Sequence, residues 1–171
     1  QKLSKIQNEF EAALRAHGGR IVTPEGTDIS FKIGDRNVTK QDGDASMARA
    51  RKGKVLIDRE IEIPAGAIRV APIEESVNGT VFIQYSQWRG QTVRGIRMKF
   101  VNGKIVEIEV DDGMKNVFYE LRAAGEEAKM FREIAVGFNP LLSVPLDRAV
   151  IPYYGYGAGV VRVSIGDNSE L

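Results

Sequence analysis

Two segments of alternating apolar and polar residues, separated by a short turn, constrain the fold of this chain most strongly. In both segments the apolar residues of the alternating set are even-numbered. They are Ile96, Met98 and Phe100 before the turn, and Val106, Ile108 and Val110 after it. Alternation with a period of two is typical of strands that bury one face. The sequence therefore predicts an antiparallel hairpin over residues 94–110.

The turn of this hairpin has to keep the even-numbered residues on one face. A two-residue turn of Asn102 and Gly103 would oppose residues whose numbers sum to an odd value, which would divide the apolar set between the two faces. We therefore expect a three-residue loop of residues 101–103 with Gly103 left-handed in a bulge. This register places Arg97 opposite Glu107 on the solvent face.

The other periodicities indicate an α+β fold, with an antiparallel-rich sheet of about nine strands and two helices. Helical spacing of apolar residues predicts a helix of about four turns, whose apolar residues run from Leu3 to Leu14 and which Gly18 and Gly19 end, and a second over about residues 114–130. His17, the only histidine, falls at the end of the first helix and is expected to cap it. The nine expected strands cover residues 20–23, 29–33, 55–64, 68–72, 81–85, 94–100, 105–110, 131–139 and 160–165.

Charge and composition argue against several partners. The 24 basic and 23 acidic side chains nearly cancel, so neither nucleic acid nor a membrane surface is expected as a partner. Residues 39–54 carry Arg49, Arg51, Lys52 and Lys54, which would suit a phosphate or nucleic-acid site. Because no aromatic residues are interleaved with these charges, a solvated loop is favoured.

Cysteine and hydropathy suggest where such a protein resides. The chain has no cysteine, which suits a reducing compartment, and no apolar run approaches the roughly 20 residues needed to cross a bilayer. We expect a cytoplasmic protein whose residues 1–171 form a single domain. Because the sequence begins on Gln1 and ends soon after a strand pattern, a fragment of a longer chain is also expected.

Five short motifs, taken in order, resemble the thermophilic metallo-aminopeptidase family, whose relatives include aminopeptidase T and aminopeptidase S. They are residues 24–29 (PEGTDI), 63–67 (IPAGA), 71–79 (APIEESVNG), 133–140 (EIAVGFNP) and 166–168 (GDN). The resemblance implies an α+β catalytic lobe, frequent dimers, and a site where two divalent ions hold a water that attacks the first peptide bond of a substrate.

The resemblance also implies where metal ligands would stand. The family's first Glu corresponds to Ala67, which has no donor atom, and the second corresponds to Glu133, which is retained. A family His corresponds to Arg162, a cation that repels a metal ion. Further His and Asp ligands lie beyond the end of this chain. We therefore expect Glu133 and Arg162 to form an ion pair in the emptied site, although an exposed strand-end carboxylate is an equal alternative for Glu133.

Three hypotheses for function follow. The residues favour a domain that has lost the di-metal site and keeps the fold for binding or assembly, as a homodimer built on open sheet edges, with no cofactor and with its catalytic residues unknown. The alternative is a metal-dependent aminopeptidase acting on peptides with Zn, Co or Mn, whose missing ligands come from outside this chain. An enzyme of different chemistry on the same scaffold has no residue in its support. Glu74 and Glu75 are expected to belong to a solvated link, since adjacent strand residues face opposite ways.

Overall fold

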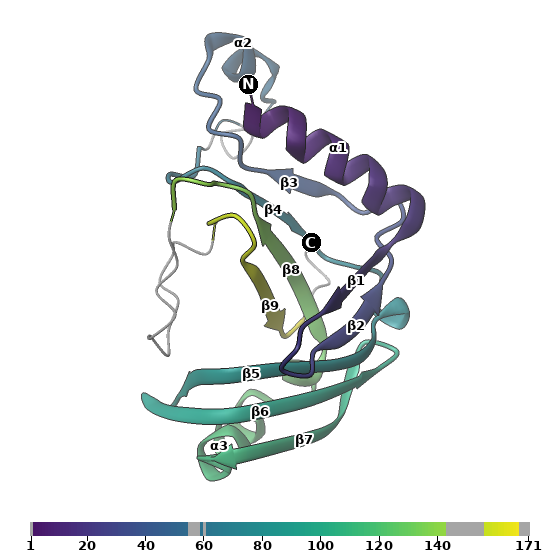
Figure 1. Cartoon of the computed structure of the whole chain (residues 1–171), viewed down its shortest axis with the longest axis vertical. Helices are drawn as coiled ribbons and strands as arrows, with labels where there is room; N and C mark the ends of the chain where they lie inside the picture. Colours follow the sequence, from purple (N-terminus) through teal and green to yellow (C-terminus); the bar gives the residue numbers. More distant parts are fainter. Residues whose placement is uncertain (1, 55–58, 60, 143–155, 168–171) are drawn as a thin grey trace.

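The computed structural model describes residues 2–54, 59, 61–142 and 156–167, whose strands form two antiparallel sheets (Figure 1). The first sheet contains β1 (Gly19–Val22), β2 (Asp28–Phe31), β5 (Asn78–Trp88), β6 (Gln91–Val101) and β7 (Lys104–Asp112), in the order β1-β2-β5-β6-β7. The second contains β3 (Val38–Lys40), β4 (Ala67–Val70), β8 (Phe131–Gly137) and β9 (Val161–Ile165), in the order β3-β4-β8-β9. This architecture confirms the α+β, antiparallel-rich fold of about nine strands.

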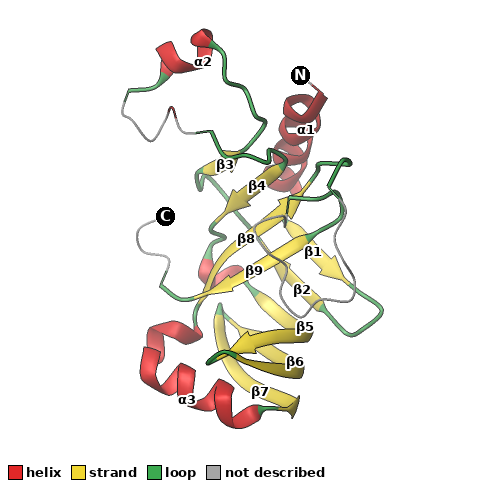
Figure 2. Ribbon diagram, turned by 90° about the vertical axis from the view of Figure 1, so that its left-hand side faces the viewer, coloured by secondary structure: helices red, strands yellow, loops and turns green. Residues whose placement is uncertain are grey.

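The described structure has three α-helices, α1 (Lys2–His17), α2 (Met47–Lys52) and α3 (Met114–Ala124), of which α1 and α2 lie at one end and α3 lies at the other (Figure 2). Two short 3-10 helices, η2 (Glu74–Ser76) and η3 (Glu126–Lys129), accompany them. α1 runs beside β3, whereas α3 lies against the first sheet near β7. Among the described helices, none is long and apolar enough to cross a membrane.

α1 is held to the second sheet by polar contacts as well as by the edge-to-face contact of Phe10 with Phe138. The side chain of Gln7 is fully buried, and its Nε2 donates to the carbonyl oxygens of Gln41 and Ala67, both at 3.2 Å. Glu11 accepts from Lys40 Nζ at 2.6 Å and from Arg15 Nη2 at 2.8 Å. The helix therefore anchors the β3–β4 end of the sheet.

Three expectations for local structure need correction. Residues 39–54 are not a continuous loop, because β3 extends to residue 40 and the Ser46 hydroxyl caps α2 by accepting from the Arg49 amide at 3.2 Å. The second predicted helix ends at Ala124 rather than at residue 130, because Gly125 takes φ 86° and residues 126–129 continue as 3-10 helix. For the strand expected over residues 55–64, residues 55–58 and 60 lie outside the described part, and residues 61–64 form no strand.

The β6–β7 hairpin keeps its apolar face by a route that differs from the expected one. Asn102 and Gly103 form a two-residue turn with φ 49° and 77°, and Val101 pairs with Lys104. The register then shifts between Phe100 and Lys99, which leaves Val106 as the extra residue of a bulge. Phe100 then faces Ile105, Lys99 faces Glu107 and Met98 faces Ile108. Arg97 faces Glu109, not Glu107 as expected.

One apolar cluster joins the two sheets. Val93, Ile96 and Met98 of β6 belong to the same buried cluster as Val70 of β4 and Ile134 of β8. At the junction, the rings of Phe100 and Phe131 meet edge to face with centroids 5.3 Å apart. The second sheet is thus held in place by the core of the first.

Candidate functional site

The three positions that the family resemblance singles out lie on one face of the second sheet. Ala67 on β4 pairs with Gly137 on β8, and Arg162 on β9 pairs with Ala135 on β8. Glu133, Ala135 and Gly137 are two residues apart along β8 and so share a face. Because directly paired residues also project on the same side of a sheet, Ala67, Glu133 and Arg162 project from this face, with Ala67 four residues from Glu133 along β8. We call it the polar face.

A second arginine stands in the same row of the polar face. Arg69 on β4 pairs with Ala135, which pairs in turn with Arg162, so two guanidinium-bearing residues flank one small alanine. Neighbouring strands are about 4.8 Å apart, which puts the two arginine backbones about 10 Å from each other. The methyl group of Ala135 is too short to separate the two long side chains. Positive charge therefore stands on both sides of Ala135, on β4 and on β9.

Ala67 has no side-chain donor atom and is fully buried. Its exposed fraction is 0%, and its carbonyl oxygen accepts from the Gln41 amide at 2.8 Å and from Gln7 Nε2 at 3.2 Å. The assignment of Ala67 as a lost ligand position stays a prediction.

Glu133 faces a guanidinium group. Its Oε2 lies 4.0 Å from Nε of Arg69, and Arg69 Nη1 lies 3.8 Å from Oε1 of Glu62. Arg69 thus stands between two carboxylates. Within the described residues no ion pair joins Glu133 to Arg162, whose guanidinium carbon lies 5.7 Å from the ring centroid of Tyr156. The pairing of Glu133 with Arg162 stays a prediction, while the structure records a different neighbour for each residue.

Tyr156 closes the polar face. Its side chain is 1% exposed, and its hydroxyl donates to Oε1 of Glu62 at 2.7 Å. Burial, followed by the hydrogen bond to Glu62 and the negative charge of that carboxylate, raises the pKa of Tyr156 above its ordinary value. The phenol is therefore a neutral donor at physiological pH. Tyr156, Glu62, Arg69 and Glu133 lie next to one another, and we call them the Tyr156 network. Among them only Tyr156 and Glu62 share a hydrogen bond, and Nε of Arg69 and Oε2 of Glu62 are buried without a hydrogen-bond partner.

Two glycines allow the backbone around Tyr156 to reach the sheet. A Cβ on Gly137 would lie 2.2 Å from the carbonyl oxygen of Gly157, and one on Gly66 would lie 2.9 Å from that of Tyr156. The close approach is secured by the Asn139 amide, which donates to the Tyr156 carbonyl at 2.9 Å. Side chains at Gly66 or Gly137 would push the tyrosine away from the polar face.

Sequence reasoning did not find Tyr156, Glu62 or Arg69. The Tyr-Gly tract of residues 153–159 indicates a loop, and only its described part, residues 156–159, can be placed. Arg69 has no local signal, because its position opposite Arg162 depends on the pairing of three strands that are distant in sequence. Glu74 and Glu75, in contrast, lie in η2 as a link, where Glu74 pairs with Arg36 at 3.0 Å.

The residues present do not fit a pair of divalent metal ions. Such ions take several oxygen or nitrogen donors that converge without a competing cation. Here both carboxylates of the Tyr156 network have Arg69 within 4.0 Å, and one of them also accepts from Tyr156. Across the described residues, no group of three His, Asp or Glu side chains could hold a metal ion. The polar face is a neutralised ionic cluster.

Comparisons with known proteins place the chain in a family. Residues 20–144 match the model of the thermophilic metalloproteases (M29), a range that includes Ala67 and Glu133 but ends before Arg162. Wild-type AmpT from Thermus thermophilus has a similar structure, with a TM-score of 0.55 and 25% sequence identity. The similarity covers 75% of this chain but only 31% of that one, so this chain spans about a third of the solved relative. A search of curated proteins finds no match.

Proposed function

Because this chain belongs to the thermophilic metalloprotease family (M29), we propose that it is an aminopeptidase-like domain that has lost the di-metal hydrolytic site. In this proposal the fold is kept for binding or assembly. Family membership alone does not decide activity, because chemistry depends on the residues of a site rather than on the scaffold.

The observation that carries the proposal is the occupation of the polar face by the chain's own charges. Ala67 is enclosed and has no donor, and the one retained family ligand, Glu133, lies beside Arg69. A divalent ion placed near Glu133 would be repelled by Arg69 on β4 and by Arg162 on β9, the two strands on either side of β8. Without a metal ion, each of the two carboxylates, Glu62 and Glu133, already has Arg69 as a cationic neighbour.

Metal binding and peptidase activity test this proposal together. The purified chain would be incubated with Zn, Co or Mn, freed of loose ions by gel filtration, and analysed by mass spectrometry for bound metal. We expect no stoichiometric metal and no release of amino acids from unblocked peptides. Retention of one or two ions per chain, lost in Glu133→Gln and accompanied by release of N-terminal residues, would contradict the proposal.

A second candidate function is a metal-dependent aminopeptidase that receives its missing ligands from outside this chain. One observation favours it, namely that the chain spans only 31% of AmpT, so most of that protein has no counterpart here. The natural open reading frame, produced in full, separates the two candidates. Metal-dependent hydrolysis by a longer product, absent from residues 1–171 alone, would support the aminopeptidase; its absence from both would support the loss of the site.

Assembly as a homodimer on open sheet edges remains part of the proposal. The two sheets end in β1 and β7, and in β3 and β9. An unpaired edge strand presents backbone donors and acceptors to another chain. Sedimentation equilibrium of the purified chain across a range of concentrations would give the mass directly, and a monomer at every concentration would contradict homodimer assembly.

A further inference from the structure

The outer side of β7 and the groove beside it form a second candidate site, far from the polar face along the fold (Figure 1). β7 is the last strand of the first sheet, and the described residues pair with its outer side only at Lys104, which bridges to Met130. Beyond the bulge at Val106, residues 107–112 therefore present an open strand edge. An added strand would find backbone hydrogen-bonding groups there.

The solvent face of this edge is acidic. Glu107 and Glu109 face Lys99 and Arg97 of β6, and Asp111 projects on the same side of the sheet. Lys99 lies 3.9 Å from Glu107, and Arg97 lies 2.9 Å from Asp111. Within the described residues, the ion pairs of these acids come from β6 alone. A strand added along β7 would meet carboxylates at every second residue.

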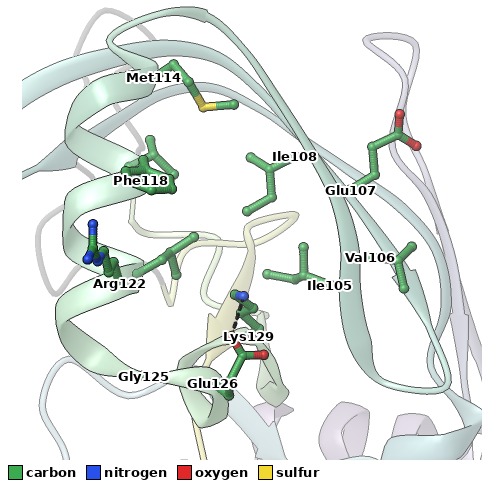
Figure 3. Close-up of a pocket in the computed structure, with 12 residues that line it drawn as sticks. Ile105, Val106, Glu107, Ile108, Met114, Phe118, Arg122, Gly125, Glu126 and Lys129 are labelled. Atoms are coloured by element: carbon green, nitrogen blue, oxygen red, sulfur yellow. Dashed lines mark hydrogen bonds and ion pairs between the residues drawn. The ribbon is translucent and has the colours of Figure 1, made fainter.

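The opposite face of the same edge is apolar and opens into a groove. Ile105 and Ile108 of β7 point toward α3, which contributes Met114 and Phe118 (Figure 3). The groove has a volume of about 510 Å³. Phe118 is 56% exposed and Met114 is 43% exposed, so helix packing leaves both side chains accessible. Apolar residues of an added strand would cover them.

The two faces together define the sequence that would fit. Successive residues of a strand point to opposite faces, so one set would meet the acids and the other would enter the groove. A second copy of this chain does not satisfy this requirement. Antiparallel pairing of β7 with itself would set Glu107, Glu109 and Asp111 against one another, and like charges directly opposite are destabilising.

We infer that the β7 edge binds an extended segment of a partner protein in which basic and apolar residues alternate. The segment adds a sixth strand to the first sheet. Its Lys or Arg side chains pair with Glu107, Glu109 and Asp111, while its aliphatic side chains enter the groove against Phe118. Acidic side chains on the edge also exclude self-pairing, so the same residues give affinity for one partner and reject another.

Peptide binding tests the inference directly. A fluorescently labelled peptide of four Lys-Val repeats would be titrated with the purified chain, and its anisotropy measured at low and at physiological salt. We expect saturable one-to-one binding that weakens as salt is raised, because exposed charge pairs are screened. Peptides of the same composition but with the order Lys-Lys-Val-Val, or with Glu in place of Lys, should bind at least about tenfold more weakly, a difference of about 1.4 kcal/mol.

Variants of the protein separate specific strand addition from general attraction. Glu109→Lys reverses one charge of the edge and Phe118→Gln removes the ring from the groove, and each should weaken binding of the Lys-Val peptide by about tenfold. Glu25→Gln alters an exposed acid of the β1–β2 turn and should leave binding unchanged. Circular dichroism of each variant would verify that the fold is retained.

Two results would overturn the inference. Equal binding of the alternating and the Lys-Lys-Val-Val peptides would mean that the attraction has no strand geometry. Concentration-dependent dimerisation of the chain that is abolished by Phe118→Gln would show that the groove is covered by a second copy instead. Loss of binding in Glu109→Lys and Phe118→Gln, with Glu25→Gln unaffected, would support the inference.

Discussion

At the scale of single residues, the polar face combines side chains from three strands that are distant in sequence. The pairing of β4, β8 and β9 brings Ala67, Glu133 and Arg162 to one face. Glu133 then has a cationic neighbour in Arg69. In the proposed function, the alanine and the two arginines replace ligands by fixed charge.

The Tyr156 network predicts a pH dependence at the alkaline end. Burial and the neighbouring Glu62 carboxylate raise the pKa of Tyr156 in the folded state above the value of about 10 in the unfolded chain. The stabilisation is therefore present below about pH 10 and is lost as the pH rises through the folded-state pKa. Tyr156→Phe should lower the free energy of unfolding by about 1 kcal/mol at pH 7, because a hydrogen bond to a charged group is lost.

Urea denaturation between about pH 8 and pH 11 would measure this effect. The difference in stability between the natural chain and Tyr156→Phe should shrink as Tyr156 ionises. Tyr119→Phe is a suitable control, since Tyr119 lies on α3 and is 42% exposed. A difference that stays constant over the whole pH range would contradict the proposed role of the Tyr156 hydroxyl.

Only part of the candidate site could be read from the sequence. Ala67 and Glu133 were identifiable because they stand at fixed places in short motifs, and strand pairing places both on one face. Arg69 and Tyr156 could not be identified in this way. Arg69 reaches Glu133 through the β4–β8 pairing, and Tyr156 reaches the sheet because Gly66 and Gly137 leave room for its backbone. Both depend on contacts between distant segments, for which a single sequence carries no signal.

At the scale of the secondary-structure elements, α1 is attached to β3 through the Glu11 carboxylate, and the stability of the fold should depend on whether this group is ionised. Burial is the largest single influence on the pKa of Glu11 and would raise it, but the hydrogen bonds from Lys40 and Arg15 together outweigh it and lower the pKa. The stabilisation is thus complete above about pH 4.5 and is lost as the pH falls through the folded-state value. Glu11→Gln should cost about 1 kcal/mol at pH 7 and almost nothing near pH 3.

A matched variant on the same helix controls for this measurement. Glu9 pairs with Lys5 at 3.8 Å, but both side chains are well exposed. Glu9→Gln should therefore change the free energy of unfolding by less than about 0.5 kcal/mol at either pH. If Glu9→Gln and Glu11→Gln were equally destabilising at pH 7, the contacts of Glu11 with β3 would have no special role in holding α1.

The β6–β7 turn offers a prediction about backbone conformation. Gly103 has φ 77°, and a Cβ at this position would lie 2.5 Å from the carbonyl oxygen of Glu74. Gly103→Ala should lower the free energy of unfolding by about 2 kcal/mol or more, since a left-handed alanine alone costs about 1–2 kcal/mol. Asn102→Gly, at a position of φ 49°, should change it by less than about 0.5 kcal/mol. Similar thermal midpoints for Gly103→Ala and the natural chain would contradict the observed turn.

The same hairpin shows how far periodicity alone can determine a fold. Parity correctly required one unmatched residue, and it placed Met98 and Ile108 on one face. The expected place of that residue was wrong, because Asn102 and Gly103 suit a two-residue turn and the extra residue is absorbed at Val106. Val106 is accordingly 57% exposed rather than buried. Periodicity requires one unpaired residue between the two strands, but local turn preferences decide where that residue lies.

At the scale of the whole molecule, the shared core predicts that both sheets unfold together. Phe131 begins β8, packs its ring on Phe100 of β6, and donates its amide to the Gly103 carbonyl at 2.8 Å. β8 of the second sheet therefore begins in contact with the β6–β7 turn of the first sheet, and the apolar cluster includes residues of both sheets. Residues 1–171 should behave as a single domain with one cooperative transition.

Two independent measurements can test this cooperativity. Trp88, the only tryptophan, lies in β5 and reports on the first sheet, while far-UV circular dichroism reports on all elements. The two urea curves should coincide, and the calorimetric and van't Hoff enthalpies should agree. Phe131→Leu should move both curves to lower urea by an equal amount, with a loss of about 1–1.5 kcal/mol, because it weakens the junction that both sheets share. Separate shifts of the two curves would show that the sheets are distinct folding units, and that the polar face can be lost while the β7 edge stays folded.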